Sequence, residues 1–215
     1  MKPPVHPRIL LVDDHPMMRA GVSQLLRQSI PGVVIEEAES ARQALAAVMA
    51  GRWDLVLLDL DLPDRNGLDL LVDLRQAAPD LPVVVVSGLA EQELGLQVLR
   101  LGAAGFCSKA AAADQLAGAV GKVLAGGRHV SPALAERLAD SMSTGGRVHR
   151  HDELSAREMQ ILLSITAGKT VGEIAGQLSL SVKTVSTYRT RLLRKMRLRT
   201  NADLMRYGIR HGLVR

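Results

Sequence analysis

The stretch Leu55-Val56-Leu57-Leu58-Asp59 places an aspartate directly after four consecutive apolar residues. A continuous apolar run of this length is typical of a strand buried on both faces, as in a parallel sheet covered by helices. Similar short runs recur on either side of it along the chain. They lie at Ile9–Val12, Val33–Ile35, Val83–Val86 and Ala104–Cys107.

Segments of helical length separate these runs. The expected helices lie at about 16–29, 40–50, 66–77, 91–101 and 112–125, with proline and glycine residues in the intervals. Five strand-helix units predict an α/β domain with a doubly wound, five-stranded parallel sheet and right-handed crossovers.

The residues that follow the strands carry reactive side chains. They are Asp13 and Asp14 after the first strand, Asp59 after the third, Ser87 after the fourth and Ser108-Lys109 after the fifth. Because a doubly wound sheet binds its ligands outside the carboxyl ends of its strands, we expect these groups to meet at one edge.

The side chains expected at that edge of the sheet indicate a metal-assisted site for a phosphoryl group. A cluster of carboxylates repels itself unless a divalent cation neutralises it, and hard oxygen ligands suit Mg²⁺. A lysine supplies a point charge for a phosphoryl group, and a carboxylate can accept that group covalently. Taken singly, each residue has a plainer explanation, since Asp13-Asp14 can cap a helix, Asp59 can begin a turn and Ser87 can be a loop hydroxyl.

In the type, order and spacing of these residues, positions 8–125 resemble a two-component receiver domain, which has a flavodoxin-like fold. The resemblance implies that a sensor histidine kinase is the partner that phosphorylates Asp59. It also implies that Mg²⁺ is held by Asp13, Asp14, Asp59 and the backbone carbonyl of Asp61.

The same resemblance assigns three further roles. Lys109 would pair with the phosphoryl oxygens, and Ser87 would donate a hydrogen bond to the phosphoryl group. Phe106, three residues before Lys109, falls on the aromatic switch position of receivers and would become buried after phosphorylation.

The chain has 215 residues, a length that suits two small domains. Its two halves differ in net charge. Lys and Arg number 11 against 15 Asp and Glu in residues 1–127, but 16 against 7 in residues 128–215. A basic second half suggests a nucleic-acid-binding module, the alternative being a solvated basic face. Aromatic residues make up only 2%, which argues against a binder of single strands that stacks bases.

Cysteine content and hydropathy indicate the cellular compartment in which the protein is expected. The single cysteine, Cys107, excludes an internal disulfide framework and fits a reducing compartment. No apolar run approaches the ~20 residues that a membrane helix needs. We therefore expect a cytoplasmic protein that has no membrane partner.

Helix-start signals are dense after residue 153. Ser155 with Glu158, Thr170 with Glu173 and Thr200 with Asp203 have capping-box spacing, and Ser181 can cap a further helix. These signals predict an all-α domain of four helices at about 155–167, 171–178, 182–197 and 201–211. Only Ser179-Leu180-Ser181 joins the second helix to the third, as in a helix-turn-helix.

The domain boundaries follow from these patterns. We expect a first domain at 1–127, a linker at 128–151 and the helical domain at 152–215. The linker contains a short helix, for which Ser131 is the N-cap and Pro132 the first residue.

The expected helix 182–197 has one apolar and one polar arc. The apolar arc comprises Val182, Val185, Leu192, Leu193 and Met196, with Arg189 among them. The polar arc carries Lys183, Ser186, Thr187, Thr190, Arg194 and Arg197. From Glu173 to Asp203 the chain has seven lysines and arginines and no intervening acid, which suits contacts with phosphates.

Residues of about 152–214 resemble the LuxR-type helix-turn-helix domain of NarL/FixJ response regulators, through Leu154-Ser155, Glu173-Ile174-Ala175 and Leu180-Ser181-Val182-Lys183. The resemblance makes 182–197 the recognition helix for double-stranded DNA. Lys183, Ser186, Thr187 and Thr190 would face base edges, while Tyr188, Arg189, Arg191 and Arg194 would hold phosphates. Helix 201–211 would pair two domains through Leu204, Tyr207 and Gly208, for which a core role is the alternative.

Together the two resemblances imply a transcription regulator that phosphorylation controls and that binds DNA as a homodimer; they do not imply an enzyme. One rival is a phosphatase, because Asp59-Leu60-Asp61-Leu62 resembles the D-x-D motif of the haloacid-dehalogenase type. In that family the motif follows the first strand and a cap domain is normal, whereas no insertion here is long enough for one. Another rival is a DNA-binding regulator whose receiver is never phosphorylated and serves only for dimerisation.

Overall fold

The computed structural model describes residues 6–88, 91–109, 113–143, 150–178, 180–211 and 213. The chain divides into two compact units, Met1–Gly146 and Arg147–Arg215.

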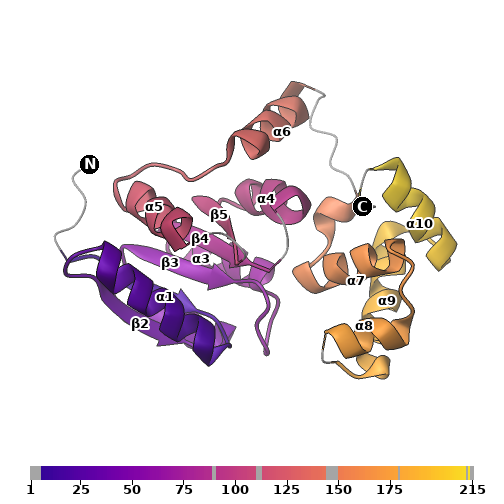
Figure 1. Ribbon diagram of the computed structural model, residues 1–215, viewed down its shortest axis with the longest axis horizontal. Coiled ribbons are helices and arrows are strands. Elements are labelled where there is room, and N and C mark those ends of the chain that lie inside the picture. The colour runs from indigo at the N-terminus through magenta and orange to yellow at the C-terminus, as the bar shows by residue number, and fades with distance from the viewer. Residues whose placement is uncertain are drawn as a thin grey trace. The chain divides into compact units, whose positions relative to one another are not determined.

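A five-stranded parallel sheet in the order β2-β1-β3-β4-β5 forms the centre of the first unit. Its strands are β1 (Arg8–Val12), β2 (Val34–Ala38), β3 (Leu55–Asp59), β4 (Val83–Ser87) and β5 (Gly105–Ser108). The helices are α1 (Pro16–Ser29), α2 (Ala41–Ala50), α3 (Gly67–Ala77), α4 (Glu91–Arg100) and α5 (Ala113–Leu124). Helices flank the sheet in Figure 1, and the expected doubly wound fold is confirmed.

Strands that are buried on both faces were predicted more accurately from the apolar pattern than the exposed edge strand. All residues of β3 and β4 are buried, as continuous apolar runs predict. The second strand begins one residue later than expected and extends over Glu36 and Glu37 to Ala38. Because β2 is an edge strand, most of its side chains are partly or fully exposed, so its sequence is only partly apolar.

The first unit continues beyond α5. His129 forms an isolated parallel bridge with Gly105 of β5, and α6 (Pro132–Ser143) follows. The Ser131 hydroxyl accepts a hydrogen bond from the amide of Leu134 at 3.1 Å, which confirms the predicted cap. Thus α6, which the sequence places in the linker, groups with the first unit, while residues 144–149 lie outside the described ranges.

The second unit is helical. It contains the 3₁₀ turn η1 (Arg150–Glu153) and the helices α7 (Ala156–Thr166), α8 (Val171–Gln177), α9 (Val182–Met196) and α10 (Asn201–Arg210). The three predicted capping boxes are present, and Ser181 caps α9. Ser179, in the short α8–α9 connection, lies outside the described residues.

The apolar arc of α9 forms part of the core of this unit. Val185, Leu192 and Met196 are fully buried. Val182 belongs to the same apolar arc, but its side chain is 56% exposed. Val182 is the first residue of α9, and the first buried residue of the helix is Val185, about one turn later.

Candidate functional site

The carboxyl ends of β1, β3 and β5 bring together three predicted site residues. Lys109 Nζ lies 2.7 Å from Asp59 Oδ2 and 2.9 Å from Asp13 Oδ2. The register of the sheet sets this arrangement, since Val12 of β1 pairs with Leu58 of β3, the residues that precede Asp13 and Asp59. The lysine thus bridges two carboxylates that belong to neighbouring strands.

Both carboxylates are buried, with Asp13 4% and Asp59 2% exposed. Burial raises the pKa of Asp59 to about 6, although the Lys109 ammonium opposes the shift. Burial alone would lower the pKa of Lys109, but the Asp59 and Asp13 carboxylates outweigh it and raise that pKa. At neutral pH the site therefore holds a lysine cation and an ionised but poorly solvated Asp59.

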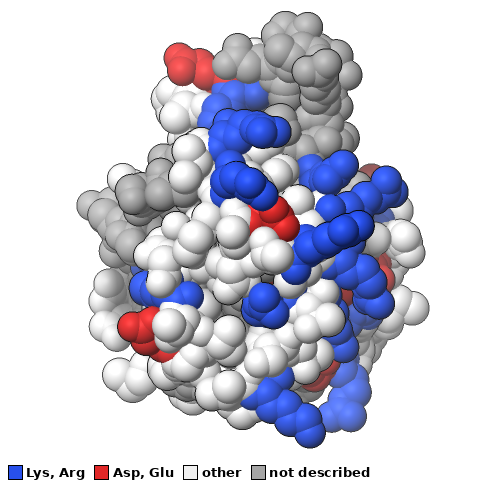
Figure 2. Space-filling model, turned by 90° about the vertical axis from the view of Figure 1, so that its right-hand side faces the viewer, with Lys and Arg blue, Asp and Glu red and all other residues white. Residues whose placement is uncertain are grey.

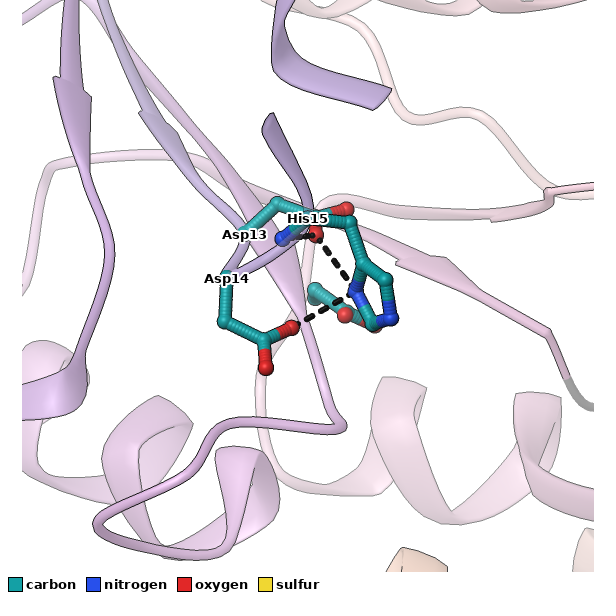
Figure 3. Close-up of side chains that lie close together, drawn as sticks. Asp13, Asp14 and His15 are labelled. Carbon is teal, nitrogen blue, oxygen red and sulfur yellow. Dashed lines mark hydrogen bonds and ion pairs between the residues drawn. The ribbon is translucent and has the colours of Figure 1, made fainter. Parts of the chain in front are cut away.

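Asp14 and His15 complete the acidic cluster on the side toward solvent. The His15 ring turns toward the carboxylates of Asp13 and Asp14 in Figure 3, with Nδ1 3.2 Å from Asp13 Oδ1 and 2.6 Å from Asp14 Oδ1. The backbone amide of His15 also donates to Asp13 Oδ1 at 2.8 Å. His15 was not predicted to belong to the site, although its position directly after the acidic pair was a signal.

This donor set fits a hard divalent cation. Asp13, Asp14, His15 and Asp59 each offer a ligand atom within 4.8 Å of the others. Asp59 Oδ1 is buried and has no hydrogen-bond partner among the residues that the structure describes. A buried carboxylate oxygen without a partner is costly, and carboxylate oxygens are the ligands that Mg²⁺ prefers.

Ser87 and Phe106 lie on the neighbouring strands. Ser87 ends β4 and is 2% exposed, one residue beyond Val86, the β4 partner of Asp59. Its carbonyl accepts a hydrogen bond from the Lys109 amide at 2.7 Å. Phe106 is already 2% exposed in this structure, so the predicted inward movement is not available from this conformation.

A tight loop follows Asp59. Asp61 forms an isolated antiparallel bridge with Asn66, and the Gly67 amide donates to the Leu60 carbonyl at 3.1 Å. A Cβ atom on Gly67 would lie 2.4 Å from the Leu60 Cα atom, so only glycine permits this closure. The loop keeps Asp61 close to the end of β3.

One buried cation beside the acidic cluster was missed by the sequence analysis. Arg19 of α1 is 6% exposed and donates from Nη1 to the Asp13 carbonyl at 2.8 Å. Its partners on the other side are carboxylates of Glu37 and Glu39. A polar residue on the otherwise buried face of the expected helix 16–29 was the available signal.

The second unit presents a basic helix face. Most of the predicted DNA-contacting residues of α9 are exposed, namely Lys183, Ser186, Thr187, Thr190, Arg191 and Arg194. The hydroxyls of Thr187 and Thr190 donate to the carbonyls of Lys183 and Ser186 at 3.0 Å. Figure 2 shows that lysines and arginines gather along one side of the face in view, with few acidic residues between them.

Two of the predicted phosphate-contacting residues are only partly exposed. Arg189 Nε donates to Asn201 Oδ1 at the start of α10, at 2.6 Å. This bond explains how an arginine is accommodated in the apolar arc, because Asn201 satisfies part of its guanidinium. The Tyr188 ring lies 6.0 Å from the guanidinium carbon of Arg191.

The predicted pairing residues of α10 lie mainly inside their own unit. Leu204 is fully buried and Gly208 is buried, which favours the core alternative for both. The Tyr207 hydroxyl lies 2.8 Å from Nδ1 of the buried His151. Ile209 is a large apolar residue on this helix that is exposed, at 69%.

Among the described residues, no helix is both long enough and apolar enough to span a bilayer. Two family models match the chain. Residues 9–121 match the response regulator receiver domain, and residues 152–207 match the bacterial regulatory proteins of the luxR family.

Relatives match over nearly the whole length. The transcriptional activator protein ExaE of Pseudomonas putida is 40% identical over 209 residues, which cover 96% of this chain and 98% of that protein. The response regulator UvrY of Escherichia coli (strain K12) is 35% identical over 207 residues, which cover 95% of this chain and 94% of that protein.

Solved structures share the fold. A LuxR-family two-component response regulator from Aurantimonas sp. SI85-9A1 has a TM-score of 0.58 at 29% identity, over 64% of this chain and 99% of that chain. RcsB of Salmonella enterica serovar Typhimurium, bound to promoter rprA in the presence of the phosphomimetic BeF₃⁻, has a TM-score of 0.58 at 24% identity. That match covers 94% of this chain and 98% of the RcsB chain, and it shows the fold alone.

Proposed function

Because this chain belongs to the two-component response regulators that join a receiver domain to a LuxR-type DNA-binding domain, we propose that phosphorylation of Asp59 controls DNA binding through α9. The observation that carries the proposal is the bridging of Asp13 and Asp59 by Lys109, which leaves Asp59 Oδ1 without a partner among the described residues. A sensor histidine kinase is the proposed source of the phosphoryl group.

The transfer is a nucleophilic substitution at phosphorus. One oxygen of the Asp59 carboxylate forms the new bond to phosphorus, and the bond from phosphorus to the donor breaks with its electron pair leaving on the donor. Above its pKa of about 6, Asp59 is mainly the carboxylate that this step needs. Lys109 stabilises negative charge on the phosphoryl oxygens, and Ser87 donates its hydroxyl to one of them.

We assign the cation to Asp13, Asp14, Asp59 and the backbone carbonyl of Asp61. Mg²⁺ bound there supplies a positive charge that offsets the carboxylates and the incoming phosphoryl group. The role of Asp13 and Asp14 is to hold that charge beside Asp59, while Lys109 remains available to the phosphoryl oxygens.

The output is a population shift. The phosphoryl group adds negative charge and acceptor oxygens at the end of β3, and Ser87 responds from the end of β4. Coupling free energies of ~1–3 kcal/mol are typical of such switches. The chain then binds double-stranded DNA as a homodimer in the cytoplasm. RcsB, which has a related fold, is seen bound to a promoter in the presence of a phosphomimetic.

The test is to incubate the purified full chain with Mg²⁺ and acetyl phosphate and to follow its intact mass. We expect the wild type to gain one phosphoryl group and the Asp59→Asn variant to gain none. Asp61→Asn is the matched control, because Asp61 acts through its backbone carbonyl and should still allow labelling.

Two results would contradict the proposal. Absence of labelling with any donor would select the regulator whose receiver serves only for dimerisation. Sustained consumption of the donor, with many turnovers per chain, would select the phosphatase suggested by the Asp59-Leu60-Asp61-Leu62 motif.

A further inference from the structure

Arg19 is a buried arginine that makes three directed hydrogen bonds. Its guanidinium donates from Nη1 to the Asp13 carbonyl at 2.8 Å, from Nε to Glu37 Oε2 at 2.8 Å and from Nη2 to Glu39 Oε1 at 2.5 Å. The side chain is 7% exposed, whereas those of Glu37 and Glu39 are 41% and 60% exposed. One rigid fork therefore connects α1, the end of β1 and the end of β2.

The position of Asp13 depends on this fork. The Asp13 amide donates to the Ala38 carbonyl at 3.1 Å, and Arg19 holds the Asp13 carbonyl from the opposite side. With both ends of the residue fixed, the carboxylate is directed at Lys109 Nζ and the His15 amide. A small rotation of this backbone would move the Asp13 carboxylate away from Asp59.

Glu37 and Glu39 explain why an arginine can be buried here. A buried guanidinium is costly unless it is paired and its donors are satisfied. The hydrogen bond that Arg19 donates to Glu37 is the main cause that raises the pKa of Arg19, and the Ser23 hydroxyl donates to the other oxygen of Glu37 at 3.2 Å. Lysine cannot reproduce three donors in one plane, so it cannot replace arginine in this position.

We propose that Arg19 is a positioning residue for the cation site, and that it acts by fixing Asp13 through its hydrogen bonds and not through its charge alone. The proposal rests on the function proposed above. Residues that orient metal ligands from behind typically change metal affinity by roughly 10- to 100-fold when they are replaced.

The experiment measures Mn²⁺ binding to the full chain, with free Mn²⁺ followed by electron paramagnetic resonance. We expect Arg19→Met, which keeps the apolar length of the side chain, to weaken Mn²⁺ binding about tenfold. Arg19→Lys, which keeps the charge, should not restore it. Glu36→Gln is the matched control, because Glu36 neighbours Glu37 on β2 but forms an exposed ion pair with Arg8.

Thermal unfolding without metal separates positioning from simple bracing. A residue that only braces α1 against β2 would lower the unfolding temperature and leave the Mn²⁺ dissociation constant unchanged, which would overturn the proposal. Recovery of wild-type affinity in Arg19→Lys would also overturn it, in favour of a charge effect.

A second variant covers a failure of Arg19→Met to fold. Glu37→Gln combined with Glu39→Gln keeps the arginine and weakens its fork, and we expect a loss of about fivefold in Mn²⁺ affinity. Unchanged affinity in that folded variant would contradict the proposal. If the wild type itself bound no Mn²⁺, the proposed cation site would fail, which is a different outcome from loss of the Arg19 effect alone.

Discussion

At the scale of single residues, the site is a balance between burial and opposite charge. Asp59 is almost fully buried, and one ammonium faces both it and Asp13. Burial outweighs the lysine, so the pKa of Asp59 lies at about 6, above its ordinary value of 3.8. The folded chain therefore holds this carboxylate at a cost that a bound cation would offset.

This balance predicts how stability changes with pH. A carboxyl whose pKa is higher in the folded than in the unfolded state destabilises the fold as pH rises from about 4 to about 7. In the presence of a metal chelator, the free energy of unfolding of Asp59→Asn should therefore rise relative to that of the wild type as pH increases. The expected change between pH 4 and pH 7 is on the order of 2 kcal/mol. Urea unfolding at a series of pH values measures the difference.

Asp64→Asn is the control for that titration. Slight burial raises the pKa of Asp64, but amides of Ala41 and Arg42 donate to its carboxylate and lower the pKa overall. Its stabilising effect is complete above pH 4 and is lost only below that value, so its difference from the wild type should stay flat from pH 4 to 7. A flat difference for Asp59→Asn as well would contradict the account of the site.

Sequence reasoning reached the site residues that follow strands. Parallel strands end at one edge, so Asp13, Asp59 and Lys109 could be brought together from order and spacing alone. Arg19 could not be placed in this way, because its role depends on the side-chain geometry of two glutamates that are distant in sequence. The same holds for Arg189, whose partner Asn201 lies on another helix.

At the scale of elements, a buried leucine packs α6 against the rest of the first unit. Leu134 is 1% exposed, and a Cβ atom on Gly95 of α4 would lie 2.8 Å from its Cδ2 atom. The Ser131 hydroxyl also donates to a carboxylate oxygen of Glu91. Because Gly95 has no side chain, the Leu134 side chain can pack against α4 at this position.

Replacing Leu134 should release α6 without unfolding the sheet. Loss of a buried leucine typically costs about 2–5 kcal/mol, and here the loss falls on one surface helix. We expect Leu134→Ala to accelerate amide hydrogen exchange in residues 132–138 while exchange in β3 and β4 stays slow. Ala135→Ser, at an exposed position of α6, is the control. Equal acceleration throughout the first unit would show that α6 is not a separable element.

The N-terminal ends of the helices in the second unit were predicted well from sequence. A capping box is a local interaction over four residues, so Ser155, Thr170 and Thr200 could be recognised without knowledge of the fold. The exposure of Val182 and the partly exposed residues of β2 depend on which neighbours cover them. Local sequence does not contain that information.

At the scale of the whole molecule, an acidic receiver is joined to a basic DNA-binding unit. The basic face of α9 should make binding to duplex DNA strongly dependent on salt, because phosphate contacts release counterions. We expect Arg191→Ala to weaken binding similarly for all sequences and to reduce the slope of log K against log salt by about 1. Arg42→Ala, on α2 of the first unit, should leave that slope unchanged. An unaltered slope in Arg191→Ala would exclude this residue from the interface.

The central claim is that a phosphoryl group on Asp59 controls the affinity of α9 for DNA. The most direct measurement selects a preferred duplex from a random library with the wild type, then titrates it with and without Mg²⁺ and acetyl phosphate. The donor should tighten wild-type binding by roughly 5- to 150-fold and should not alter binding by Asp59→Asn. Equal affinity of the wild type with and without the donor, or an equal response in Asp59→Asn, would contradict the claim.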